Sequence, residues 1–461
     1  DLWNGVVLEK SEIIELSEGL SHVYIEIIDK LSLIYSSKYN LPQDALRIIL
    51  RPAIVPITHC FFERLIRLNK IVNVSKGKPL VAAQSLVAIP NTIEAFHERL
   101  STQRFNQSVI SLLTGVWGLE SIHVDQTDEL NLTQPATYRN NLFQISKNKL
   151  SIANILSRCN RFIKWLPPLG RFPVLTFANA TGALHKRFFY FKNFKEVDDH
   201  WKLEPVKGDL GLRKSIFNES QLASNEISVL LSNSGFSDKQ QLVITNLYFE
   251  FLRGSFPLQF LEGFQNNYDA AKKALAPFKV SALLSSGAGG TCSSFVSGHA
   301  KSRGFKIIIA QHGGHYGYLK DVSPILEGEW PACDQFKTWG WTRLPRHPAI
   351  RQMQTHPLPS PWLSERRLYW KGLVIGGDKL FDILWMPQMM KRFTGAPQGA
   401  SSTRRDVINE FSNAMIDFVK QSTKAKIKIF CKPYNPAAVY LMADTYKAMG
   451  ELGGDFFTCS D

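Results

Sequence analysis

The chain has 461 residues, of which 44% are hydrophobic and 20% charged, a composition that argues against long disorder and predicts two or three globular domains. Lys and Arg outnumber Asp and Glu by 54 to 40, giving a formal net charge of +14. This excess favours an anionic partner, such as nucleic acid, a phosphorylated metabolite or an acidic membrane surface. The 6 cysteines form no C-x-x-C pair, which argues against a disulfide framework or a zinc cluster. No apolar stretch is long and uncharged enough to predict a transmembrane span.

The first hundred residues show helical periodicity interrupted by short breaks. Apolar residues recur at three-to-four spacing over 11–39 and again over 44–71, where Pro52 and Pro56 are expected to kink or split the helix. The stretch 80–90 is typical of a strand and loop, and 105–118 of a short helix that ends at a glycine.

Residues 120–215 carry no clear periodicity. Within them, the run HKRFFYFKNFK (185–195) alternates basic and aromatic side chains. Such a run can stack nucleic-acid bases, but it also fits a half-buried element with solvated lysines. The second interpretation is the simpler one, so we expect no nucleic-acid partner.

From residue 240 the pattern changes to that of an α/β protein. Two helical stretches precede a buried strand at 279–286, a glycine-rich turn at 287–291, a helix at 292–304 and a second buried strand at 305–310. A strand, helix and strand in this order predict a parallel sheet. The fold class is therefore α/β with a helical N-terminal elaboration.

A Pro-rich stretch follows and suggests a domain boundary. Residues 344–364 contain five prolines and show little apolar periodicity, so we predict a linker there. It would separate an N-terminal domain, 1–343, from a C-terminal Rossmann-like domain, 365–461. Because the second domain shows few strands, we expect it to be incomplete at its C-terminal end.

Three polar loops follow predicted strands, the position at which open parallel sheets bind ligands. They are SSGAGGT (285–291), QHGGHYG (311–317) and KPYN (432–435). Backbone N–H groups and hydroxyls at a helix start can hold an anion. The phosphate-binding candidates are Ser286, Gly287, Gly289, Gly290, Thr291, Gln311, His312, Gly313, Gly314, Tyr316, Lys432 and Asn435.

Other chemistries fit these loops less well. GAGGTC lacks the last glycine of a dinucleotide fingerprint, and no acidic residue follows the next strand. His312 and His315 have no third ligand at a suitable spacing, so we predict no metal. The nearest acidic residues are Glu327 and Glu329, which are candidates to orient a sugar or a base.

These loops also carry a family resemblance. QHGGHYG, followed by EGE (327–329) and DQFKTWGW (334–341), resembles the signature of a bacterial family of surface-carbohydrate transferases. The segment 47–65, with Arg64, and the segment 104–113 are similar to further blocks of that family. The resemblance is clearest over 280–342.

The resemblance implies a GT-B-like architecture, in which two Rossmann-like domains face a cleft, and a similarity to capsule Kdo transferases. It implies transfer of a sugar, such as Kdo or a nonulosonic acid from a CMP-sugar, to a glycan or lipid-linked acceptor, without a cofactor or metal. Glu327, Glu329 and His315 would then be the catalytic candidates, and Lys432 would bind the donor phosphate. The net charge fits a cytoplasmic protein that contacts the anionic inner face of the membrane.

Three alternatives remain open from the sequence. A sugar-nucleotide epimerase can share two Rossmann-like domains. A nucleic-acid-binding protein would use the run at 185–195, and an inactive scaffold would need no catalytic residue.

Overall fold

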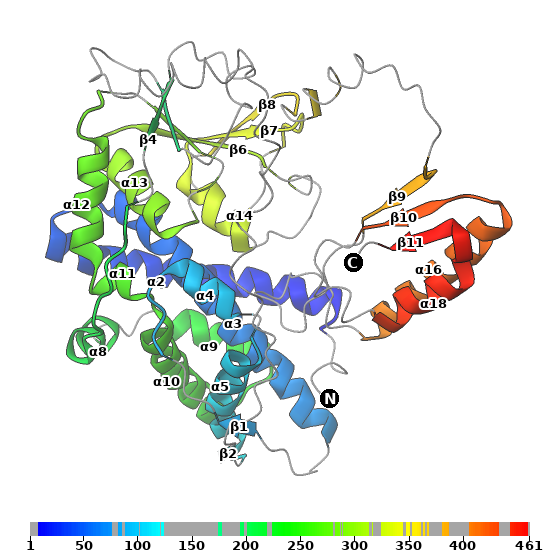
Figure 1. Ribbon diagram of the computed structural model, residues 1–461. Helices are drawn as coiled ribbons and strands as arrows, with labels where there is room; N and C mark the ends of the chain where they lie inside the picture. Colours follow the sequence, from blue (N-terminus) through cyan, green and yellow to red (C-terminus); the bar gives the residue numbers. More distant parts are fainter. Residues whose placement is uncertain are drawn as a thin grey trace.

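The computed structural model describes most of the chain (Figure 1). The described residues are 8–75, 82–84, 88–100, 102–119, 121–123, 174–177, 194–197, 201–218, 224–279, 282–285, 287, 289–312, 316, 324–343, 347–350, 353–360, 363–364, 367, 380–386, 405–432 and 443–459.

A six-stranded parallel sheet, in the order β4-β3-β5-β6-β7-β8, organises the larger part of the fold. Its strands are β3 (Val174–Phe177), β4 (Phe194–Val197), β5 (Ala282–Ser285), β6 (Lys306–Ala310), β7 (Gln335–Thr338) and β8 (Gln354–Pro357). All five pairings are parallel, so the carboxyl ends of the strands share one edge of the sheet. The prediction of an α/β protein with a parallel sheet is confirmed.

The predicted strand-helix-strand unit is β5, α13 (Thr291–Ser302) and β6. Both strands are almost wholly buried, which explains their continuous apolar runs. Gly304 follows α13 with a φ of +76°, a left-handed conformation that favours glycine. On the helix itself, Gly298 lies so close to α3 that a Cβ would meet Ile49 at 2.4 Å.

Two long helices, α2 (Lys10–Tyr39) and α3 (Gln43–Ser75), pack against each other, and α3 also packs against α13. Of the two expected effects of Pro52 and Pro56, a kink or a split, the split does not occur, because α3 is one helix of 33 residues with both prolines inside it. Each proline removes one helical hydrogen bond. Burial of α3 among α2, α13 and α14 (Pro324–Glu329) compensates for those losses.

By length and composition α3 could also cross a membrane. However, 94% of its most apolar window is buried inside the fold, as expected for a core helix. Its apolar side chains belong to the main hydrophobic core, which also includes residues of α2, α10 (Asp238–Ser255) and β6.

Further helices complete this part of the molecule, among them the predicted helix that ends at Gly118. They are α4 (Ile93–Arg99), α5 (Gln103–Thr114), η1 (Gly115–Trp117), α8 (Leu210–Asn218), α9 (Ser224–Asn233), α10 (Asp238–Ser255), α11 (Leu258–Leu261), α12 (Phe264–Leu275) and η3 (Trp330–Ala332). Two short strands, β1 (Ala82–Gln84) and β2 (Ser121–His123), pair in parallel.

A second parallel sheet, in the order β11-β10-β9, lies in the C-terminal part of the chain (orange and red in Figure 1). Its elements are β9 (Ile383–Trp385), α16 (Arg405–Lys424), β10 (Ile429–Cys431), α18 (Ala443–Gly453), η4 (Gly454–Phe456) and β11 (Phe457–Cys459). A separate hydrophobic cluster around Val419, Ile429 and Met449 forms its core. The fold thus combines two parallel α/β sheets with extensive helices.

The predicted linker at 344–364 needs a correction. β8 lies inside this stretch and forms the edge of the six-stranded sheet by pairing with β7. An edge strand tolerates Pro357 at its end because a proline only lacks one ladder donor there. At least residues 354–357 therefore belong to the first sheet.

Candidate active site

A cluster of polar side chains lies where β5 and β6 end. β5 ends at Ser285, whose Oγ accepts a hydrogen bond from the N–H of Gly287 at 2.9 Å. Glu329, the last residue of α14, approaches this turn so closely that a Cβ at Gly287 would lie 3.1 Å from Glu329 Oε1. A glycine at 287 therefore makes room for the carboxyl group of Glu329.

A chain of hydrogen bonds connects that carboxyl group to the surface. The hydroxyl of Tyr316 donates to Glu329 Oε2 at 2.9 Å. The same hydroxyl lies 3.1 Å from Nε2 and 3.2 Å from Nδ1 of His312. Tyr316 is fully buried and Glu329 is 4% exposed, whereas 46% of the His312 side chain is exposed. We call His312, Tyr316 and Glu329 the relay.

Burial controls the ionisation of the relay. Desolvation raises the pKa of Glu329 to about 8, and the hydrogen bond from Tyr316 only partly opposes this effect. Burial next to Glu329 also raises the pKa of Tyr316. A carboxyl group whose pKa lies near neutrality can exchange protons at physiological pH, which is the property required of a general acid or base.

Gln311 connects the two sequence motifs that carry the family resemblance. Its Oε1 accepts two hydrogen bonds at 2.8 Å, one from the backbone N–H of Trp339 and one from Nε1 of Trp341. Beneath them, Phe336 stacks on Tyr316 with a centroid distance of 5.7 Å. Gln311 is 5% exposed, so in this structure it fastens the TWGW segment beside the relay.

Glu327 points away from the relay and into the helical layer. Its Oε2 lies 2.5 Å from Nε2 of His59 on α3, and both side chains are fully buried. His347 Nε2 lies 3.4 Å from Oε1 and 3.1 Å from the hydroxyl of Tyr24 on α2. Burial alone would raise the pKa of Glu327, but His59 and His347 outweigh it and lower that pKa. Glu327 therefore anchors α14 to α3 as an ionised carboxylate.

The start of α13, a predicted phosphate site, is occupied by a carboxylate of the protein itself. Glu94 on α4 accepts hydrogen bonds from the backbone N–H of Thr291 at 2.8 Å and from its hydroxyl at 2.7 Å. Thr291 is fully buried, and Gly290 leaves room for the Glu94 carboxylate. The positive end of α13 thus already holds an anion.

The remaining predicted residues lie in different places. Lys432 is exposed directly after β10, and its backbone N–H donates to the carbonyl of Trp385 at 2.8 Å. Gly289 precedes α13, and a Cβ at this position would lie in open space. Five predicted residues lie outside the described part of the chain: Ser286, Gly313, Gly314, His315 and Asn435. The run 185–195 also lies there, except for its last two residues in β4.

Sequence reasoning missed His59 and Glu94 because their partners are 268 and 197 residues away. His59 left one signal, since it is the one ionisable side chain besides Cys60 in the mostly apolar run 52–62. Among the described residues, no group of three or more His, Cys, Asp or Glu side chains could hold a metal ion.

The sequence profile of the LIC12162 family transferases matches residues 12–447. The chain belongs to this family. No curated protein and no solved structure matches it. As a LIC12162 family transferase, the protein is an enzyme, and the match covers the six-stranded sheet, the relay and the Gln311 contacts but ends before β11 of the second sheet.

Proposed function

We propose that this LIC12162 family transferase is a glycosyltransferase that moves a sugar from a nucleotide-sugar to a glycan or lipid-linked acceptor at the inner face of the membrane. The observation that carries the proposal is the relay, in which Tyr316 connects the half-exposed His312 to the buried Glu329. The two parallel sheets support a GT-B-like arrangement, in which each sheet binds one substrate.

The relay supplies the proton acceptor that sugar transfer needs. As the acceptor hydroxyl attacks, its proton passes to a ring nitrogen of His312, and the other ring nitrogen gives its proton to the Tyr316 oxygen. The Tyr316 proton then passes to the carboxylate of Glu329. Meanwhile the bond between the sugar carbon and the phosphate oxygen breaks, and the nucleotide leaves with that electron pair.

Positive charge and N–H groups stabilise the departing phosphate in this scheme. Lys432 and the loop before α13 are the candidates, and neither requires a metal ion. A CMP-linked 2-keto sugar acid, such as Kdo or a nonulosonic acid, is the donor that the family resemblance favours. Glu327 is fully buried against His59 and takes no part in the proposed chemistry.

The test is calorimetric titration with CMP, UDP and GDP, followed by release of free nucleotide from CMP-Kdo and from UDP- and GDP-sugars. His312→Ala should abolish release while the protein stays folded, and Lys432→Ala should weaken nucleotide binding about tenfold or more. Lys424→Ala, an exposed lysine on α16, is the matched control. If the protein binds UDP or GDP but not CMP, the proposed donor changes to a UDP- or GDP-sugar. If it binds no nucleotide, the proposed function is overturned.

A further inference from the structure

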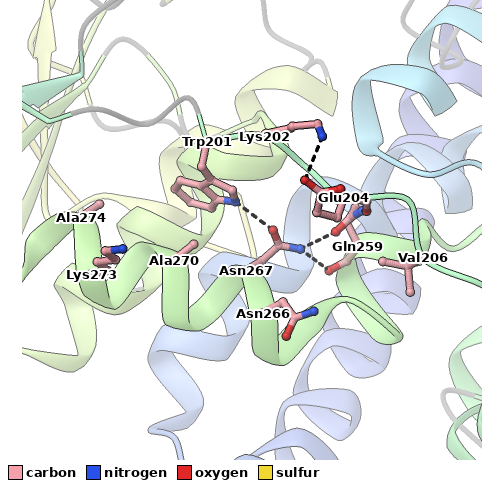
Figure 2. Close-up of a pocket in the computed structure, with 10 residues that line it drawn as sticks. All are labelled: Trp201, Lys202, Glu204, Val206, Gln259, Asn266, Asn267, Ala270, Lys273 and Ala274. Atoms are coloured by element: carbon pink, nitrogen blue, oxygen red, sulfur yellow. Dashed lines mark hydrogen bonds and ion pairs between the residues drawn. The ribbon is translucent and has the colours of Figure 1, made fainter.

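A groove of about 520 Å³ lies between α12 and the segment 201–206, and it shares no residue with the relay (Figure 2). Its volume falls in the range of small-molecule sites, about 300–1,000 Å³. Trp201 lines one side, and α12 contributes residues from Asn266 to Ala274 on the other.

The indole ring of Trp201 is held in one orientation. Its Nε1–H donates to Oδ1 of Asn267 at 2.9 Å. Asn267 is only 3% exposed, and its Nδ2 donates to the carbonyl and the side-chain oxygen of Gln259 and to the carbonyl of Gly263. Because the amide of Asn267 cannot turn without losing these bonds, the indole edge is fixed. A ligand in the groove therefore meets the apolar faces of the ring.

Small side chains create the space beside that ring. Ala270 and Ala274 lie one turn apart on the side of α12 that faces Trp201 (Figure 2). A longer side chain at either position would fill the groove. The wall opposite the indole is thus flat and apolar.

The rim of the groove is polar and mostly basic. Lys202 and Glu204 form an ion pair of 3.1 Å with exposed side chains, and Asn266 and Lys273 are exposed on α12. The rim therefore offers two ammonium groups, one carboxylate and one amide. A ligand that matches it has an apolar face, several hydroxyl groups and a net negative charge.

We propose that this groove binds one acidic sugar unit of the acceptor glycan. This inference rests on the proposed glycosyl transfer. The C–H face of a pyranose ring lies against Trp201, and its hydroxyls bond to Asn266 and Glu204. Its carboxylate pairs with Lys273 or Lys202. The fixed indole lowers the ordering cost of binding.

The probes are trigalacturonate, a uronic-acid trisaccharide, and maltotriose, its neutral counterpart, titrated by calorimetry without any donor. The wild-type protein should bind trigalacturonate at least tenfold more tightly than maltotriose. Trp201→Ala, Ala270→Leu and Lys273→Glu should each weaken binding tenfold or more. Lys424→Glu, the same charge change outside the groove, should leave it unchanged. Trp201→Phe keeps the apolar bulk and is the variant to use if Trp201→Ala misfolds. Circular dichroism checks that every variant is folded.

Failure of the groove can be separated from failure of the proposed function. Glu329→Gln should leave trigalacturonate binding unchanged, because Glu329 does not line the groove. If the protein binds trigalacturonate through Trp201 but binds no nucleotide, only the proposed transferase mechanism is overturned. Absence of trigalacturonate binding by the folded protein, or equal binding of maltotriose, would overturn the acidic-sugar groove. Binding of a thymidine hexanucleotide that depends on Trp201 would overturn it in favour of a nucleobase site.

Discussion

Glu327 and Glu329 lie two residues apart on α14, yet the pKa of Glu327 is lowered and that of Glu329 is raised. Each helical residue turns the side-chain direction by about 100°, so the two carboxyl groups point to nearly opposite sides. Glu327 meets His59 in the helical layer, and Glu329 meets Tyr316 at the end of the sheet. One short helix thus carries both a buried anchor and a carboxyl group with a raised pKa.

Glu329 should make the fold less stable as the pH rises. Its pKa is raised to about 8 from an ordinary value of 4.5, so the folded state holds the proton more tightly. Stability should therefore fall between pH 4.5 and 8, by a few kcal/mol at most. Glu329→Gln should flatten this part of the profile in urea denaturation. An equal slope in both proteins would contradict the raised pKa.

Glu327 should have the opposite dependence. Its lowered pKa means that it stabilises the fold above its ordinary value of 4.5, and that this contribution is lost as the pH falls through the lower, folded value. Glu327→Ala removes one partner of a buried pair and should cost about 3–5 kcal/mol at neutral pH. Urea denaturation measures this loss. An unchanged midpoint would show that His59 does not need the carboxylate.

Tyr316→Phe tests the relay with little change in packing. The phenyl ring can keep the stack on Phe336, while the hydroxyl that joins His312 to Glu329 is lost. Turnover should fall about 10²–10⁴-fold, with little change in nucleotide affinity. Wild-type turnover should rise with pH towards 8 as Glu329 ionises, and this rise should vanish in Glu329→Gln. Normal turnover in Tyr316→Phe would rule out the relay.

Gln311→Ala should loosen the TWGW segment. The change leaves the Trp339 N–H and the Trp341 indole N–H without their acceptor, at a cost of about 1–3 kcal/mol. Thermal unfolding and the near-UV circular dichroism of the tryptophans should report the loss. Gln311→Glu keeps an acceptor oxygen and should lose less. Equal losses in the two variants would show that the acceptor is not what matters.

Glu94→Gln tests whether the start of α13 binds the donor phosphate. The wild-type carboxylate already accepts from Thr291, so it competes with a second anion at that helix end. Removing its charge should tighten nucleotide binding several-fold by calorimetry. Weaker or unchanged binding would place the phosphate elsewhere, for instance at Lys432.

Local patterns predicted some elements of the fold but not others. The apolar runs before residues 287 and 311 predicted β5 and β6, and the glycines at 118 and 304 marked helix ends. They failed at α3 and at 344–364, where prolines suggested breaks. There, packing from distant segments outweighed the local cost of proline.

The sequence by itself determined the α/β class and the parallel order of β5 and β6, because these follow from periodicity and turn chemistry within short windows. Only the tertiary structure decided which of the two neighbouring acids has a raised pKa and which has a lowered one. Glu327 and Glu329 look alike in the sequence, but burial raises the pKa of Glu329, whereas contact with His59 helps to lower that of Glu327. Burial and a partner's charge set a pKa, and both are properties of the packed chain.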